Sequence, residues 1–186
     1  WKNIFVREIP ADEANRILAQ HGSGGFEPVF NGKDFSGWAG PVENYEVRDG
    51  AIVCKPGKGG TIYTQDEYDD FVVRLEFKLP PGGNNGLAIR YPGSGDTAYV
   101  GMCELQVLDS EHPKYAKLDV RQYHGSVYGM VPAARGFLRP SGEWNFQEVT
   151  VKGPQVKGEL NGNAILDADG SQVRESRGTP RHPGRA

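Results

Sequence analysis

The chain has 186 residues, of which 37% are hydrophobic and 24% are charged, and its formal net charge at pH 7 is −3. A chain of this length and apolar content can bury one substantial core, so we expect one main folded unit. The acidic balance argues against nucleic acid or an anionic membrane as the main partner, since both favour a clustered positive surface, and no apolar run is long enough to span a bilayer.

The N-terminal residues alternate apolar and polar side chains from Trp1 to Ile9, which predicts a β-strand. An unpaired strand of this kind would expose backbone groups and apolar side chains, so we expect it to pair within the fold. The following segment, Ala11 to Gln20, has the apolar spacing of a helix. We therefore expect a strand over residues 1–10, a short helix and linker over 11–25, and the main domain over 26–186.

Short alternating segments then recur along the chain, and each predicts a strand. They lie at residues 62–64, 71–79, 86–90, 98–100, 104–109 and 146–151. Clusters of Gly, Pro, Asn and Asp separate them, and Asn161-Gly162 predicts a tight hairpin turn. Many short strands with one helix predict an all-β fold, a two-sheet antiparallel jelly-roll sandwich.

Both cysteines, Cys54 and Cys103, stand in apolar strand context, so we expect buried thiols rather than a disulfide. No signal peptide is visible, but the chain starts at Trp1 without a methionine, as a processed product or a fragment would. We expect a bacterial, secreted protein, located in the periplasm or outside the cell.

The most informative polar pattern lies in residues 83–90 and 104–109. Glu104 and Gln106 are two residues apart, so on a strand they share one face, whereas Leu105 takes the other. A carboxylate and an amide side by side on a strand are not typical of a core. The pattern therefore predicts a carbohydrate-binding sheet face.

Eight motifs, in this order, resemble the 3-keto-disaccharide hydrolase family. They lie at residues 30–38, 49–52, 61–64, 68–71, 84–90, 104–109, 125–128 and 142–145. The resemblance covers Phe26 to about Asp167. It implies a concanavalin A-like jelly roll that cleaves glycosides already oxidised to a ketone at carbon 3 of the sugar.

The chain departs from that family at its two ends. Family members usually finish with a Gly-His-Ile-Gly-Leu-Gln-like segment and a strand similar to Phe-Arg-Asn-Ile-Arg-Ile-Arg-Glu-Leu, and this sequence stops before either. Trp1 to Ile9 resembles that closing strand. Either it is the end of a preceding copy in a tandem protein, or the order is permuted and it fills the closing strand's place. We favour the second interpretation.

The implied chemistry defines the expected site. A ketone at carbon 3 acidifies the hydrogen on carbon 2, so a base can remove it, and the aglycone then leaves from carbon 1 with help from an acid. We expect catalysis by Glu104, Asp109 and His124. Sugar contacts are expected from Asn85, Arg90, Gln106, Tyr128 and Trp144. A divalent metal or an arginine could hold the enolate oxygen, and no organic cofactor is expected.

Two other functions stay open. The Glu104-x-Gln106-x-x-Asp109 spacing resembles the strand of laminarinase-type glucanases, which are retaining glycosidases with two carboxyl groups about 5–5.5 Å apart. Five residues apart on a regular strand, Glu104 and Asp109 face opposite ways unless a bulge intervenes. A non-catalytic sugar-binding module is the third interpretation.

Each candidate also has a structural interpretation. Glu104 could form an ion pair with Arg90 on the adjacent strand. Asp109 could cap the loop that follows it, and His124 could be a lone hydrogen-bonded histidine. Trp144 could be a core anchor.

Overall fold

The computed structural model describes residues 2–22 and 24–173. One α-helix, α1 (Ala11–Gln20), precedes the strands of the described region. The strands are β1 (Trp38–Ala39), β2 (Tyr45–Arg48), β3 (Ala51–Cys54), β4 (Tyr63–Thr64), β5 (Phe71–Phe77), β6 (Asn84–Ile89), β7 (Cys103–Leu108), β8 (Asn145–Lys152), β9 (Gln155–Leu160) and β10 (Asn163–Asp169). Short 3-10 helices lie at Val42–Asn44, Pro113–Tyr115, Val120–Gln122 and Gly170–Gln172.

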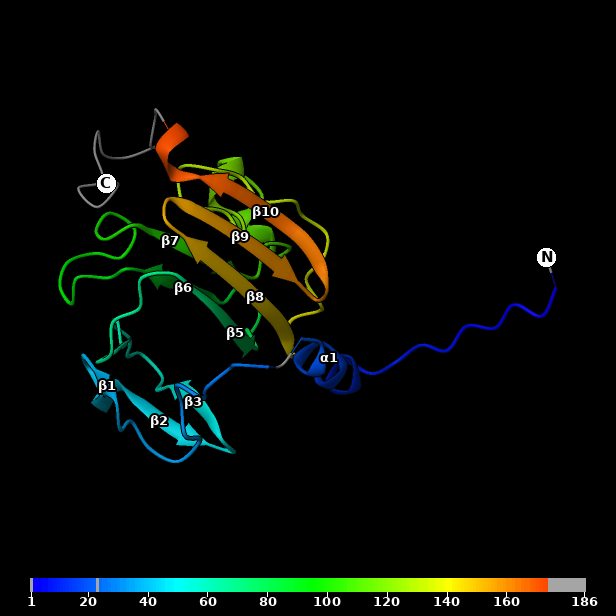
Figure 1. Ribbon diagram of the computed structural model, residues 1–186, viewed down its shortest axis with the longest axis horizontal. Helices are drawn as coiled ribbons and strands as arrows, with labels where there is room; N and C mark the ends of the chain where they lie inside the picture. The colour runs from blue at the N-terminus through cyan, green and yellow to red at the C-terminus, as the bar shows by residue number, and fades with distance from the viewer. Residues whose placement is uncertain (1, 23, 174–186) are drawn as a thin grey trace.

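Two antiparallel layers form the body of the molecule (Figure 1). One is a four-stranded sheet in the order β10-β9-β8-β5, and the other is the β6-β7 pair. A bridge between Leu105 and Val127 adds the segment that follows β7 to its free edge. Two small sheets, β1-β4 and β2-β3, complete the β structure. The expected antiparallel jelly-roll sandwich is confirmed.

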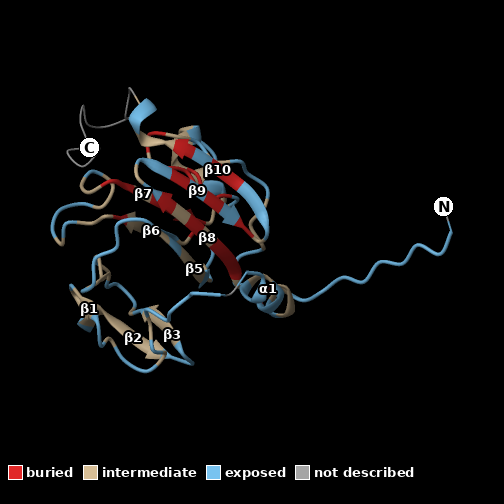
Figure 2. Cartoon of the chain, in the orientation of Figure 1, coloured by how far each residue is buried: buried red, intermediate tan, exposed pale blue. Residues whose placement is uncertain are grey.

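The core lies between these two layers (Figure 2). Leu105 of β7 and Val149 of β8 are both fully shielded from solvent, and they belong to one cluster with residues of β6, β9 and β10. Along β8, Asn145, Gln147 and Val149 are buried on the same side, in keeping with the period of two of a strand. Burial of this side fixes the register of the sheet.

The hairpin between β9 and β10 turns where the sequence predicts it. Asn161 and Gly162 have φ angles of 51° and 82°, the left-handed backbone that a two-residue hairpin turn requires. Asn and Gly are the residues that adopt this conformation most readily.

Helix α1 has the expected bounds and is tied to the four-stranded sheet by a polar side chain. Asn15 is 1% exposed, and its amide nitrogen donates to Glu76 at 2.6 Å. Its amide oxygen accepts a hydrogen bond from Arg139, also at 2.6 Å. These bonds hold the helix at the ends of β5 and β8, away from the Glu104 face of β7.

The N-terminal strand expectation is wrong for the residues that the structure describes. Residues 2–10 have no strand partner and project away from the sandwich (Figure 1). Phe5 and Val6 are 89% and 93% exposed, and the side-chain contact that this segment makes is an ion pair from Arg7 to Glu13 of α1. An alternating sequence forms a strand only when it can pair with a sheet edge, and residues 2–10 do not lie beside one. The preceding-copy interpretation stays a prediction, and Trp1 lies outside the described residues.

The cysteine expectation is half confirmed. Both thiols are free, and Cys103 is buried, but Cys54 at the end of β3 is exposed because β2-β3 is a small peripheral sheet. Within the described ranges, no helix has the length and apolar content that a membrane span requires.

Candidate functional site

Glu104 stands on the face of β7 that points away from the core. The six residue pairs between β6 and β7 run without a register shift, so Glu104, Gln106, Gly86 and Ala88 share one face. Leu105, between the two polar residues, is fully buried in the core. The predicted shared face of Glu104 and Gln106 is therefore confirmed.

Gly86 and Thr97 define the position of the Glu104 carboxylate. A Cβ atom on Gly86 would overlap its Oε1 atom, so the strand opposite can carry only a glycine if the carboxylate is to keep this position. Its Oε2 atom accepts a hydrogen bond from the Thr97 hydroxyl at 2.5 Å. Thr97 belongs to the loop that joins β6 to β7. A carboxylate is thus held at a fixed place over a bare stretch of backbone.

Partial burial changes the acidity of this group. Loss of hydration raises the pKa of Glu104; the Thr97 hydrogen bond lowers it, and the negative charge of Asp96 raises it further. The net shift is upward. A carboxyl group with a raised pKa is a better proton acceptor than an ordinary surface glutamate.

Hydrogen-bonded polar side chains lie beside Glu104 on the neighbouring segment. The backbone N–H of Tyr128 donates to the Glu104 carbonyl at 2.9 Å, so Tyr128 lies opposite Glu104 on the neighbouring segment. The Tyr128 hydroxyl accepts a hydrogen bond from Gln122 Nε2 at 2.8 Å. Gln106 donates to the Gln122 carbonyl at 3.3 Å. Because Gln122 is the donor to Tyr128, the phenol proton stays free to be donated elsewhere.

His124 lies in the core instead. It is 4% exposed, and its ring lies 5.0 Å from that of Phe77 on the opposite layer. Nδ1 accepts a hydrogen bond from the backbone N–H of Leu108, which places the ring proton on Nε2. Burial lowers the pKa of His124 to about 4, so the ring is neutral at pH 7. His124 was expected to take part in catalysis, but this placement matches the alternative interpretation of a lone hydrogen-bonded histidine.

Asp109 lies beyond the end of β7 and caps a loop. Its Oδ2 accepts hydrogen bonds from the Gly82 N–H at 2.7 Å and from the Ser141 hydroxyl at 2.8 Å. Burial opposes ionisation, but these bonds outweigh it, and the pKa of Asp109 lies below its usual value. No bulge interrupts the register of β7. Glu104 and Asp109 therefore do not converge as the two carboxylates of a retaining glycosidase would.

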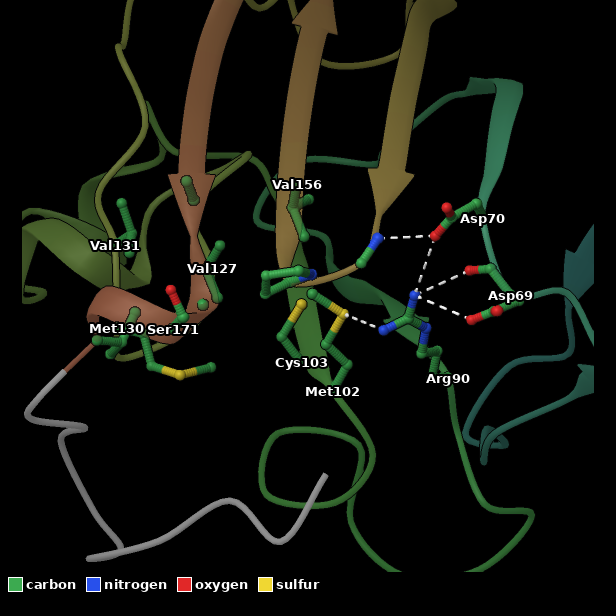
Figure 3. A pocket seen from close by; sticks show the side chains of 15 residues that line it. Asp69, Asp70, Arg90, Met102, Cys103, Val127, Met130, Val131, Val156 and Ser171 are labelled. Carbon is green, nitrogen blue, oxygen red and sulfur yellow. Dashed lines mark hydrogen bonds and ion pairs between the residues drawn. The ribbon is translucent and has the colours of Figure 1, made fainter. Parts of the chain in front are cut away.

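Arg90 pairs with two aspartates rather than with Glu104. Its guanidinium lies 3.4 Å from Asp69 and 3.5 Å from Asp70 and contacts the sulfur of Met102 (Figure 3). These residues rim a cavity of about 360 Å³ between the layers, lined mainly by apolar side chains such as Val127 and Val156. Cys103 lines this cavity, and it is next to Glu104 on a strand whose side chains alternate between faces. The cavity and the Glu104 face are therefore on opposite sides of β7.

The remaining two candidates also lie elsewhere. Asn85 is exposed on the other face of β6, and its side-chain oxygen accepts from the N–H of Gly86 at 2.7 Å. Trp144 precedes β8 in the other layer, with Lys78 Nζ 4.8 Å from its ring centre. Among the described residues, no hydrogen bond or ion pair joins either of them to Glu104.

The chemistry of the site residues gives no metal-ligand cluster. Across residues 2–22 and 24–173, no group of three or more His, Cys, Asp and Glu side chains is arranged to hold a metal ion. The donors around Glu104 are mainly a hydroxyl and amides, which fit a dedicated divalent site poorly. A bound divalent metal stays a prediction.

Residues 25–184 match the model of a protein family described as the 3-keto-alpha-glucoside-1,2-lyase-like domain. The chain belongs to this family. A 3-keto-disaccharide hydrolase from Bacteroides thetaiotaomicron is 27% identical over 187 residues, covering 87% of this chain and 64% of that relative. The chain thus spans less than two thirds of the length of this curated relative.

Solved structures share the fold of this 3-keto-alpha-glucoside-1,2-lyase-like domain. Two crystal structures of Parabacteroides distasonis proteins, both assigned by inference as glycosyl hydrolases, are 26% identical to this chain. Their TM-scores are 0.70 and 0.66. The match to the first structure covers 77% of this chain and 71% of the chain in that structure. The match to the second structure covers 85% of this chain and 77% of the chain in that structure. The chain therefore shares its sandwich fold with these two proteins.

Three predicted residues, Glu104, Gln106 and Tyr128, come together in this 3-keto-alpha-glucoside-1,2-lyase-like domain. The sequence reasoning missed Gly86, Thr97 and Gln122. A glycine inside a strand marks a close approach, so Gly86 could have been found. Thr97 and Gln122 lie in loop and 3-10 segments whose positions depend on tertiary structure, and no local pattern marks them.

Proposed function

We propose that this chain cleaves 3-keto-glycosides, among them 3-keto-disaccharides, by a reaction that begins at carbon 2 of the oxidised sugar. The observation that carries the proposal is Glu104: a half-buried carboxylate with a raised pKa on the side of β7 opposite to Leu105 and the core. The family match and the name of the Bacteroides relative support the same substrate class.

Glu104 acts as the base in this proposal. It takes the proton from carbon 2, which the neighbouring ketone makes acidic, and the electron pair enters the conjugated system toward carbon 3. The bond between carbon 1 and the aglycone oxygen then breaks, and that oxygen gains a proton. The Tyr128 hydroxyl is the proposed donor, because Gln122 already supplies a hydrogen bond to its oxygen.

The immediate sugar product is an unsaturated ketone with a double bond between carbons 1 and 2. Addition of water to carbon 1 and of a proton to carbon 2 gives the free 3-keto sugar, so elimination followed by hydration equals hydrolysis overall. An ordinary glycosidase mechanism would never break the bond between carbon 2 and hydrogen.

The test compares a nitrophenyl 3-keto-α-glucoside with the parent glucoside in D₂O. We expect cleavage of the keto compound alone, with deuterium at carbon 2 of the released sugar or with accumulation of the unsaturated ketone. Cleavage of the parent glucoside without deuterium at carbon 2 would favour the glucanase alternative. Binding of both compounds without turnover would favour a carbohydrate-binding module.

A further inference from the structure

The loop between β6 and β7 folds back over the strand that carries Glu104. Residues 90–102 form this loop, and its base is closed by a hydrogen bond from the Met102 N–H to the Ile89 carbonyl at 3.0 Å. From its far side, Thr97 reaches Glu104 with its hydroxyl. In the proposed reaction, Thr97 has no direct part.

The turn that carries Thr97 is independently braced. The N–H groups of Tyr99 and Val100 both donate to the Asp96 carbonyl, at 2.9 and 3.0 Å, and the Asp96 side chain accepts from the Ala98 N–H at 3.0 Å. The Tyr91 hydroxyl donates to the Gly95 carbonyl at 3.0 Å. Thr97 therefore does not depend on Glu104 for its own position, as expected of a group that orients another.

The contact acts on one particular oxygen. Oε1 of Glu104 lies over Gly86, where no side chain competes for space, and Oε2 is bound to Thr97. A single donor on Oε2 fixes the rotation of the carboxylate and leaves Oε1 to meet a substrate. Proton transfer from a carbon atom requires the base to be held in a well-defined position, and the hydrogen bond from Thr97 holds Glu104 in this way.

We propose that Thr97 is a positioning residue: its hydroxyl orients Glu104 so that Oε1 faces the substrate. The assignment rests on the proposed function for its catalytic meaning, but the contact itself is testable without substrate. A hydroxyl that donates to a carboxylate stabilises the charged form, so loss of the hydroxyl should make the Glu104 carboxyl harder to ionise.

The first experiment titrates Glu104 directly by ¹³C NMR of protein labelled at the glutamate δ-carbon, with Glu104→Gln assigning the resonance. Thr97→Val keeps the side-chain shape and removes the donor, so the Glu104 pKa should rise. Thr97→Ser keeps the donor and should leave the pKa near that of the unaltered protein. Thr150→Val, on the outer side of β8, is the matched control and should also leave it unchanged.

The second experiment measures turnover of the 3-keto-glucoside against pH. With Thr97→Val we expect the acid limb of the kcat/KM profile to move upward with the Glu104 pKa, and kcat on the plateau to fall about tenfold or more from lost orientation. Thr97→Ser should restore both. A purely structural hydroxyl would lower the melting temperature and leave the pH profile in place.

The outcomes separate the two proposals. An unchanged Glu104 pKa in folded Thr97→Val protein would overturn the positioning role, as would an equal loss of turnover in the serine variant. Should the valine variant not fold, Thr97→Ala supplies the same comparison. A pKa that rises in a protein unable to cleave the keto-glucoside would reject the proposed function and still support the contact.

Discussion

Gly86 and Glu104 face the same side of the β6-β7 pair so closely that a methyl group on Gly86 would occupy the place of Oε1 of Glu104. The Gly86 backbone is not in the left-handed region, so alanine can adopt it. The three atoms nearest to such a methyl group, Oε1, Cδ and Cγ, all belong to the Glu104 side chain. Gly86→Ala therefore tests the position of the carboxylate without removing it.

For Gly86→Ala we expect turnover of a 3-keto-glucoside to fall tenfold or more, because the carboxylate is displaced from its place. The melting temperature should change by only a few degrees. Gly24→Ala is the control, since a Cβ there meets nothing within 4 Å. Full activity in the Gly86 variant would show that the reaction does not depend on this position of Glu104.

Glu104→Gln should lower turnover about a hundredfold or more, as expected for loss of a general base, without lowering stability at neutral pH. The folded protein holds Glu104 with a raised pKa, so its protonated form is favoured and ionisation opposes folding. The variant should be at least as stable as the parent above the Glu104 pKa, with the difference shrinking as the pH falls through that value. Thermal unfolding at several pH values measures this, and a variant that is less stable at pH 8 would contradict it.

How far the sequence predicts this molecule depends on whether a feature is local. The helix at Ala11–Gln20 and the Asn161-Gly162 turn are encoded in adjacent residues, and β7 alternation places Glu104 and Gln106 on one face. Partners distant in the sequence were not predictable in this way. Thr97 meets Glu104 through a loop, and Arg90 pairs with Asp69 and Asp70 because its backbone leaves the strand with a φ of 52°.

Residues 2–10 have a sequence pattern typical of a strand, but they pair with no other strand in the fold. A protein starting at Ala11 should melt within about 1–2 °C of the full chain, because the removed side chains lie in solvent apart from the exposed Arg7–Glu13 pair. It should also self-associate less, since Phe5 and Val6 are removed. Calorimetry and light scattering test the two expectations. A large loss of stability would show that the segment pairs with the sandwich in solution.

The hydrogen bonds of Asp109 give it a structural role, in contrast to the catalytic role expected from the sequence. Its pKa is lowered by the hydrogen bonds from Gly82 and Ser141, which outweigh burial. A lowered pKa stabilises the folded state above the ordinary carboxyl pKa of about 4, and this contribution disappears as the pH falls through the folded value. Asp109→Asn should therefore be less stable than the parent at pH 7, with the gap closing in acid, and should retain turnover per folded molecule. Ser141→Ala, which removes one of the two donors, should show a smaller loss of the same kind. If Asp109→Asn instead abolished turnover with its melting temperature intact, Asp109 would return to the catalytic mechanism.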